Sequence, residues 1–314
     1  MYGGGTPTAP GGAPVVAAVD IGGTKIDVAL AAGDGALLGR RRLETRAPEG
    51  AAAAAERVAA AVEDLARRHA GGAPVSGAGV VCPGVIQADR ILLAPNLPGW
   101  EDVDLAGCLR QALGVASVAV TNDVRAGALA EARAGALRGC RAGLYVNLGT
   151  GLAAALVIDG RVADGAHSAA GEIGYVQPLG ALGAWPAGSH AHLEAAVSGA
   201  GLASRAANVL GEAVDPAQLF GRTDPVSVHV VHQALGALGT ALVNLAVFVD
   251  PDRVVLGGGL TASAGVVVPV LEAYLRSGVP FPPEVVLGSF PSGASLHGAA
   301  VLALDTLAVT GASR

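Results

Sequence analysis

The sequence predicts an α/β protein of two lobes, in which antiparallel strands come first and are followed by strands that alternate with helices. The chain has 314 residues, of which 52% are hydrophobic and 15% charged, so it can form a sizeable buried core. Short apolar runs between Gly-rich turns predict strands, and apolar residues with a period near 3.6 predict helices. The order of three strands, a helix and a strand occurs twice, over 15–123 and 142–289. This repetition predicts a boundary near residue 123.

The smaller N-terminal lobe is expected to span 15–123, after a flexible Gly/Pro-rich tail over 1–14. Its apolar runs predict strands, and its segments of helical period predict helices. The predicted strands are 15–20, 26–32, 35–45, 75–82 and 117–123, the helices are 49–70 and 105–113, and a loop covers 83–100.

The larger C-terminal lobe is expected to span 124–294. It is predicted to contain a helix at 124–138, a hairpin over 142–164, helices at 192–209 and 226–249, a strand at 253–259, a helix at 264–277 and a strand at 284–289. A last helix, 295–308, is expected to return to the first lobe, so that 295–314 belongs there.

Composition excludes several classes of function. A formal net charge of −6 argues against nucleic acid as a partner, because binding phosphate backbones requires a basic surface. The three cysteines lie far apart in the sequence, which is typical of a reduced, cytoplasmic protein. The longest apolar stretch, 234–249, is shorter than the roughly 20 residues that span a bilayer, so we expect a buried helix and no membrane partner. The N-terminus has no features of a signal peptide.

The turn after the first strand, DIGGTK at 20–25, has the composition of a phosphate-binding site. Gly22 and Gly23 allow positive φ and a close approach of ligand, and successive backbone N–H groups can surround an anion. Thr24 adds a hydroxyl, Lys25 adds the only lysine charge of the chain, and Asp20 can hold Mg²⁺ through water. A turn of this kind is by itself more often an ordinary hairpin.

Two further Gly-rich turns make the ligand interpretation stronger. LGTG at 148–151 repeats the pattern at the start of the second lobe, and a third turn follows a strand at Gly257, Gly258 and Gly259. The motifs of P-loop and Rossmann nucleotide sites are both missing, so these glycines belong to another kind of site.

Polar residues in apolar surroundings are the candidates for chemistry. Asn122 and Asp123 end a strand where the chain enters a helix, although Asp123 would also serve as a helix N-cap. Glu172 and Glu194 lie in apolar stretches, where a carboxylate needs a partner such as a sugar hydroxyl; an exposed place in the first turn of a helix is the alternative for Glu194. Phosphoryl transfer needs charge neutralisation, alignment and one group that accepts a proton, and these residues supply all three.

Seven segments resemble, in this order, the ROK family of bacterial sugar kinases and repressors: DIGGTK, LAPNLPGW, TND, LGTG, AGEIG, LEAAVSG and VVLGGG. The resemblance runs from about Val15 to Leu307. It implies the actin-like ATPase fold (hexokinase-type, ribonuclease H-like), whose two lobes close on ATP and sugar at an interlobe cleft. It further implies that the protein uses ATP with Mg²⁺, that its substrate is a small-molecule sugar or cyclitol, and that it forms a homodimer.

The resemblance also implies roles for individual residues. Asp123 matches the catalytic base, which removes the proton of the accepting hydroxyl at the bottom of that cleft. The sugar-contacting positions are Asn96, Asn122, Glu172, Tyr175 and Glu194. The phosphate-binding turns are matched by Gly22, Gly23, Thr24, Gly149, Thr150 and Gly151, and the segment near adenosine is matched by Gly257, Gly258 and Gly259.

The chain departs from the family at a structural zinc site. The usual His and three Cys ligands are replaced by Tyr175, Trp185, Ala187 and His192, so the sequence predicts no zinc, and His190 and His192 are expected in a solvated loop. In the family this His also contacts the sugar, so a phenol here makes an acceptor other than glucose plausible. Arg125, beside the base, is either exposed or reaches an anionic or unusual acceptor group.

The function predicted from these observations is transfer of the γ-phosphate of ATP to a hydroxyl of a hexose or hexose-like polyol. Two alternatives stay open: a kinase for a C7-cyclitol or an amino sugar in secondary metabolism, and a sugar-binding regulatory protein without kinase activity. A DNA-binding repressor is disfavoured, because only 14 residues precede Val15.

Overall fold

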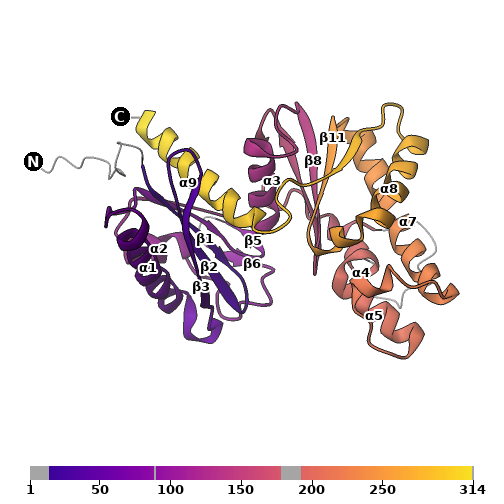
Figure 1. Ribbon diagram of the computed structural model, residues 1–314, viewed down its shortest axis with the longest axis horizontal. Helices are drawn as coiled ribbons and strands as arrows, with labels where there is room; N and C mark the ends of the chain where they lie inside the picture. The colour runs from indigo at the N-terminus through magenta and orange to yellow at the C-terminus, as the bar shows by residue number, and fades with distance from the viewer. Residues whose placement is uncertain (1–13, 88–89, 178–191, 313–314) are drawn as a thin grey trace, which may run out of the picture. The chain divides into compact units, whose positions relative to one another are not determined.

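A computed structural model describes residues 14–87, 90–177 and 192–312 (Figure 1). The chain divides into two compact units. Unit 1 contains the residues up to Ala130, Gly165–Ser168 and those from Gly293 onward, and unit 2 contains Glu131–Asp164 and Ala169–Ser292.

Unit 1 is built on a five-stranded sheet of order β3-β2-β1-β4-β7. The strands are β1 (Val16–Ile21), β2 (Lys25–Ala31), β3 (Leu37–Glu44), β4 (Gly77–Val81) and β7 (Ser117–Thr121). The first three strands are antiparallel, whereas β4 and β7 run parallel to β1. A small hairpin, β5 (Val85–Ile86) with β6 (Ile91–Leu92), lies within the segment that was expected to be a loop.

Helices cover both faces of this sheet (Figure 1). On one face, α1 (Gly50–His69) and α2 (Leu105–Leu113) pack over a core that includes the buried Trp100. On the other face lies α9 (Ala294–Ala312), packed on small residues of β1, β2 and β4.

Glycines let α9 approach its neighbours closely. A Cβ on Gly79 of β4 would lie 1.9 Å from the carbonyl oxygen of Ala299, and a Cβ on Gly298 would lie 1.9 Å from that of Ala126. Neither position tolerates a side chain without movement of the backbone. The high Ala and Gly content of the chain therefore has a structural use here, because small side chains replace the missing aromatic rings by tight packing.

Unit 2 repeats the same topology, with the sheet order β10-β9-β8-β11-β12. The strands are β8 (Ala142–Leu148), β9 (Leu152–Ile158), β10 (Arg161–Val162), β11 (Arg253–Gly257) and β12 (Glu284–Leu287). The first three are antiparallel and the last two run parallel to β8. This arrangement confirms the predicted fold class, with a similar α/β sheet in each half of the chain.

The helices of unit 2 differ from expectation in two places, since the short helix at Pro216–Leu219 was not predicted and one predicted helix is broken in two. They are α4 (Leu193–Val197), α5 (Gly199–Leu210), α6 (Pro216–Leu219), α7 (Pro225–Val249) and α8 (Ala264–Gly278), while α3 (Asp123–Ala134) links the two units in sequence. A single helix was predicted over 192–209, but Ser198 has an extended backbone and its hydroxyl caps α5 by accepting a hydrogen bond from Gly201 N at 3.0 Å. The helix is therefore broken by a cap.

Helix α7 is apolar over most of its length. Among the residues that the structure describes, it is the one helix long and apolar enough to cross a membrane, and half of that stretch is buried inside the protein. Its Gly236 and Gly239 lie against the ring of Tyr274 from α8, and it belongs to the core of unit 2. A core helix passes the same length and composition test as a membrane span, so this observation is weak support for a membrane location.

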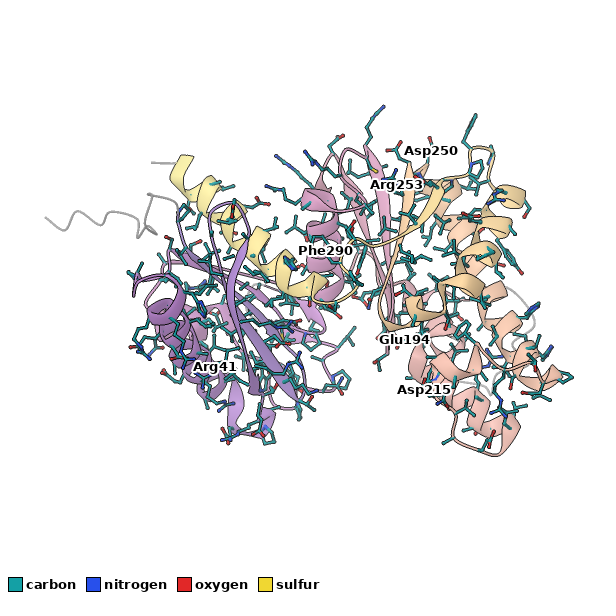
Figure 2. All side chains as sticks on the ribbon, in the orientation of Figure 1. Arg41, Glu194, Asp215, Asp250, Arg253 and Phe290 are labelled. Carbon is teal, nitrogen blue, oxygen red and sulfur yellow. The ribbon has the colours of Figure 1, made fainter. Side chains whose placement is uncertain are left out.

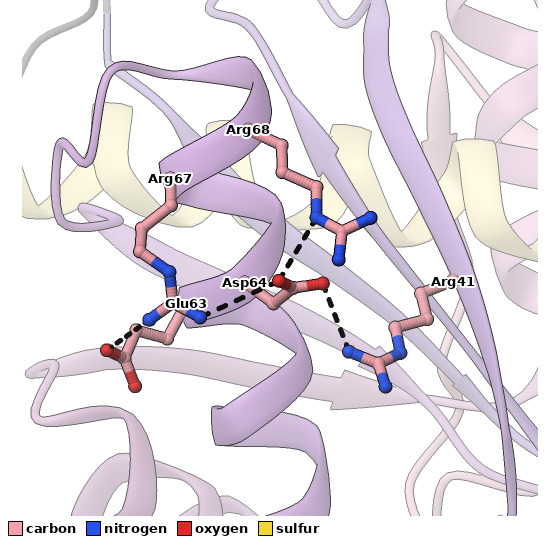
Figure 3. Close-up of polar contacts among 5 residues, drawn as sticks. All are labelled: Arg41, Glu63, Asp64, Arg67 and Arg68. Atoms are coloured by element: carbon pink, nitrogen blue, oxygen red, sulfur yellow. Dashed lines mark hydrogen bonds and ion pairs between the residues drawn. The ribbon is translucent and has the colours of Figure 1, made fainter.

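A group of exposed ion pairs joins the edge strand β3 to α1 (Figure 3). The carboxylate of Asp64 accepts hydrogen bonds from Arg41 and Arg68 at 3.1 Å each, and Glu63 pairs with Arg67 at 2.6 Å. Exposed pairs of this kind contribute little to stability individually, about 0–1 kcal/mol. Their charges also discourage the edge strand from pairing with another chain.

Candidate active site

The carboxyl ends of three parallel strands of unit 1 carry the polar residues that the sequence singled out. In the sheet register Asp20 pairs with Val81, and Val81 pairs with Thr121. The next residue, Cys82, donates its backbone N–H to the carbonyl of Thr121 at 3.0 Å. Asp20, Cys82, Asn122 and Asp123 therefore share one edge of the sheet, which is the usual place for reacting groups in α/β proteins.

Asp123 is the first residue of α3, and its neighbour provides the helix cap. The Oδ1 atom of Asn122 accepts a hydrogen bond from the backbone N–H of Arg125 at 2.9 Å. Asn122 therefore plays the part of the helix N-cap, which was the alternative role for Asp123. Arg125 is buried, so the interpretation that places it exposed is wrong.

The ionisation of Asp123 is set by opposing effects. Asp123 is exposed to solvent in part, yet the protein atoms around its carboxyl displace enough water to raise its pKa above that of an ordinary aspartate. Backbone N–H groups of Val124 and of Asp123 itself act in the opposite direction. A carboxylate with a raised pKa is a stronger base, as the role of proton acceptor requires.

Asp20 lies at the same sheet edge as Asp123 and is less exposed. Burial is the main reason that the pKa of Asp20 is raised, and the negative charge of Asp123 raises it further. The hydroxyl of Ser295, in the first turn of α9, donates a hydrogen bond to Asp20 Oδ2 and lowers the pKa. The burial of Cys82, followed by the charges of Asp123 and Asp20, raises the pKa of that thiol to about 12.

The DIGGTK turn is closed by its own backbone and by Thr45. Gly22 N donates to Lys25 O at 2.8 Å, and the buried Thr45 donates its hydroxyl to Gly22 O at 2.5 Å. The expectation of positive φ is wrong for Gly22 and Gly23, neither of which has it. Close approach explains the second glycine, because a Cβ on Gly23 would lie 2.8 Å from the Cβ of Asn96. This contact places Asn96 at the turn.

Thr24 and Lys25 complete this turn and are exposed. A hydroxyl, an ammonium group and the carboxylate of Asp20 thus lie within one short segment. Such a set fits a phosphate group and a hydrated divalent cation, since carboxylate oxygen and water are the ligands that Mg²⁺ prefers.

The LGTG turn of unit 2 is held by the start of α5. Gly199 N donates to Gly149 O at 2.9 Å, and Ala200 N donates to Thr150 O at 3.2 Å. On the other side lies Glu194, which is labelled in Figure 2. Its Oε2 atom accepts a hydrogen bond from Leu152 N at 2.9 Å. The turn between β8 and β9 therefore has a fixed backbone, which suits binding of an anion by its N–H groups.

The third Gly-rich turn, at 257–259, lies against Leu148, the first residue of the LGTG turn. Gly258 has a φ of 89°, and a Cβ on it would lie 2.5 Å from the carbonyl oxygen of Leu148. Thr261 donates its hydroxyl to Gly258 O at 2.7 Å. Because Leu148 immediately precedes Gly149, the turns at 149–151 and 257–259 are neighbours in unit 2, and a nucleotide can contact both of them.

The carboxylates expected to contact the sugar also lie in unit 2. Gly174 packs against Leu152 and Glu194, and a Cβ on it would lie 3.2 Å from the Cβ of Glu194. This close contact brings the segment that contains Glu172 and Tyr175 beside α4. Glu194 is exposed in the first turn of α4 and also holds the LGTG turn through Leu152.

Tyr175 and His192 form an aromatic pair. Their ring centroids are 4.9 Å apart and the planes meet at 70°, which is an edge-to-face contact. His192 is therefore packed on a neighbour and not simply solvated. The Tyr175 side chain remains half exposed.

No group of three or more metal-binding side chains occurs among residues 14–87, 90–177 and 192–312. Trp185, Ala187 and His190 lie outside the described residues. The prediction that zinc is absent therefore stays a prediction.

The structure brings the predicted residues into two groups, one in each unit. It also adds residues that sequence reasoning missed: Thr45 and Ser295 in unit 1, and Gly199 and Ala200 in unit 2. Gly199 belongs to the LEAAVSG segment, but the sequence offers no signal that it holds the LGTG turn. Nothing in the sequence marks the Ser295 contact, since it joins residues that are 275 positions apart.

The profile of the ROK family matches residues 16–306. The kanosamine kinase of Amycolatopsis mediterranei (strain S699) is 33% identical over 311 residues, covering 93% of this chain and 97% of that protein. The crystal structure of a ROK hexokinase from Thermus thermophilus superimposes with a TM-score of 0.78 and 31% identity, covering 95% of this chain and 99% of that one. A ROK family glucokinase from Streptomyces griseus, solved in complex with glucose and AMPPNP, gives a TM-score of 0.72 and 27% identity over 94% of this chain and 100% of the other.

Proposed function

This chain belongs to the ROK family, and we propose that it is an ATP-dependent kinase whose acceptor is a hydroxyl of a hexose or hexose-like polyol. The observation that carries the proposal is that Asp123 lies at the same sheet edge of unit 1 as Asp20, at the end of β1 where the DIGGTK turn begins. A proton acceptor and a phosphate-binding turn are the parts that phosphoryl transfer requires.

In the proposed reaction the Asp123 carboxylate accepts the proton of the acceptor hydroxyl. The hydroxyl oxygen forms a bond to the γ-phosphorus as the bond from that phosphorus to the bridging oxygen breaks, and ADP leaves. The raised pKa of Asp123 supports this role, because the carboxylate then takes up the proton more readily.

The turns at 149–151 and 257–259 are proposed to bind the nucleotide, and the turn at 22–25 to bind phosphate. Their support is the fixed backbone at Gly149 and Thr150 and the open surface at Thr24 and Lys25. Mg²⁺ would be held through water by Asp20 and would neutralise charge on the transferred phosphate. The glucokinase of Streptomyces griseus, which was solved with AMPPNP, supports ATP as the donor.

The acceptor is proposed to contact Asn96 and Asn122 of unit 1, and Glu172, Tyr175 and Glu194 of unit 2. The half-exposed phenol of Tyr175 supports an acceptor other than glucose, and the relative that acts on kanosamine supports an amino sugar. A C7-cyclitol is the further candidate, since it offers a similar ring of hydroxyls.

An acceptor panel tests the proposal. The purified protein is incubated with ATP, Mg²⁺ and, separately, glucose, an amino sugar, an N-acetylated hexosamine and a cyclitol, and ADP formation is measured. We expect acceptor-dependent ADP formation with at least one class, which an Asp123→Asn variant slows by about 100-fold or more. Binding of a sugar without any ADP formation would favour the regulatory, non-catalytic alternative. We further expect the protein to be cytoplasmic. We also expect it to form a homodimer, which sedimentation analysis of the purified protein can check.

A further inference from the structure

Thr45 directly follows β3 and binds two carbonyl groups of the DIGGTK turn. Its side chain is fully buried, its backbone N–H donates to Thr24 O at 3.0 Å, and its hydroxyl donates to Gly22 O at 2.5 Å. A hydroxyl that is buried and used inside the protein does not contact a ligand itself. Thr45 can therefore influence binding at the turn only through the two carbonyls that it holds.

The position of Thr45 is fixed by its neighbours. Its carbonyl accepts a hydrogen bond from the guanidinium of Arg57 in α1, and the same guanidinium donates to Glu49 Oε2 at 2.6 Å. Two residues further along the chain, the carbonyl of Ala47 accepts a hydrogen bond from the indole of the buried Trp100 at 3.0 Å. The Thr45 hydroxyl is thus presented from an anchored backbone, which gives its hydrogen bond a defined direction.

The turn itself lacks one of the hydrogen bonds of an ordinary hairpin. Gly22 N donates to Lys25 O at 2.8 Å, but among the residues that the structure describes no return bond runs from Lys25 N to Gly22 O. In a two-residue hairpin the residues at these positions usually exchange both bonds. Here Gly22 O accepts the Thr45 hydroxyl in place of Lys25 N.

The N–H groups of the turn consequently stay open to a ligand. The bond to Thr24 O makes the next pair of the β2–β3 register, Lys25 with Glu44, one of the non-hydrogen-bonded type, so β3 does not use Lys25 N. Within the described part of the chain, Gly23 N and Thr24 N also donate to no backbone carbonyl. Successive N–H groups of this kind form a concavity that binds anions.

We propose that Thr45 is a positioning residue for phosphate binding, because its hydroxyl occupies Gly22 O and so prevents the turn from closing as an ordinary hairpin. The inference rests on the proposed function, in which the turn at 22–25 binds phosphate. Without the hydroxyl, Gly22 O would take Lys25 N as its donor, since a carbonyl left without a partner costs free energy. One N–H group would then be withdrawn from the anion.

The single lysine of the chain allows this turn to be observed by itself. Protein that contains lysine labelled with the NMR-active nitrogen isotope has one labelled backbone amide, that of Lys25. The exchange of this amide with water is measured, and its signal is followed in titrations with AMPPNP and Mg²⁺ and with AMP, which lacks the two outer phosphates.

Three variants are compared with the wild type. Thr45→Val retains the shape of the side chain without the hydroxyl, and Thr45→Ser retains a hydroxyl. Thr240→Val is the matched control, because it removes a hydroxyl that donates to another backbone carbonyl, Gly236 O at 2.9 Å, within α7 of unit 2.

In Thr45→Val we expect the Lys25 amide to exchange about fivefold more slowly, because the closed hairpin protects it. The affinity for AMPPNP should fall about tenfold while that for AMP stays unchanged. Thr45→Ser should restore both properties, and Thr240→Val should alter neither. Unchanged or faster exchange in Thr45→Val, or equal losses of affinity for AMP and AMPPNP, would overturn the proposal.

The acceptor panel and the NMR titration can fail independently. A wild-type protein that forms no ADP with any acceptor, but shows these differences between the variants, would refute the kinase reaction and retain the role of Thr45. Acceptor-dependent ADP formation with an unchanged KM for ATP in Thr45→Val would retain the kinase and overturn that role. A wild-type protein that does not bind AMPPNP would overturn it as well.

Discussion

The contact between β4 and α9 predicts that Gly79→Ala severely destabilises unit 1. The Cβ of the new alanine would lie 1.9 Å from Ala299 O and 2.9 Å from Ala303 N. Carbon and oxygen atoms in contact across packed backbones are normally about 3.3–3.6 Å apart. The helix would have to move away from the sheet by more than about 1 Å, because neither atom belongs to a flexible side chain.

The magnitude follows from this displacement. Overpacking in a core typically costs about 1–3 kcal/mol, and a clash that only backbone movement can relieve belongs at the upper end of that range. Movement of α9 would also separate its buried Ala300 and Ala303 from β1 and β2, with loss of their dispersion contacts. We therefore expect about 3 kcal/mol of destabilisation, which lowers the Tm by about 6–12 °C in a unit of this size.

Thermal unfolding followed by circular dichroism measures this effect, with Gly265→Ala as the matched control. Gly265 lies in α8, and a Cβ there would have no neighbour within 4 Å. The control should be unchanged or stabilised by up to about 1 kcal/mol, because alanine favours helix over glycine. A Gly79→Ala protein within 2 °C of the wild type would refute the inferred rigidity of this contact.

Three further predictions concern the site. Asp123→Asn should lower kcat by about 100-fold or more with a small change in the acceptor KM, and retention of kcat in the variant would exclude Asp123 as the base. In the wild type, lowering the pH should reduce the activity already above the usual aspartate range, because a base with a raised pKa is protonated there and loses its function. A thiol reagent at pH 8 should leave Cys82 unmodified in the folded protein and label it after unfolding, since the group is fully buried and its pKa is about 12, whereas rapid labelling of the native protein would contradict this placement. Metal analysis should find no stoichiometric zinc, and one zinc per chain would show that the substitutions at Tyr175 and His192 are compensated by other ligands.

Local patterns were sufficient to predict most elements of the fold. Apolar runs bounded by glycine predict the strands of both sheets, and α1 follows from its helical period. The break at Ser198 was missed because Ala, Val and Gly around it are compatible with a continuous helix, and the cap depends on one extended backbone conformation. The hairpin β5–β6 was missed because each of its strands has only two residues.

The site was predictable to the extent that it consists of strand ends. Asp20 and Asp123 could be expected at one sheet edge, since both lie at the ends of apolar strands. The reason for the glycine at position 23 could not be derived, because it depends on Asn96, which is distant in sequence. The serine that contacts Asp20 was likewise beyond reach, since helix packing and not local pattern brings it there.

Unit 1 is assembled from segments that lie far apart in the sequence, and this has a consequence for biosynthesis. Helix α9 emerges from the ribosome only after all of unit 2 has been made, yet Val16, Ala18, Ala29 and Ala31 of the first strands depend on it for cover. The nascent chain must therefore keep one apolar sheet face shielded by other means, such as a chaperone, until α9 is released.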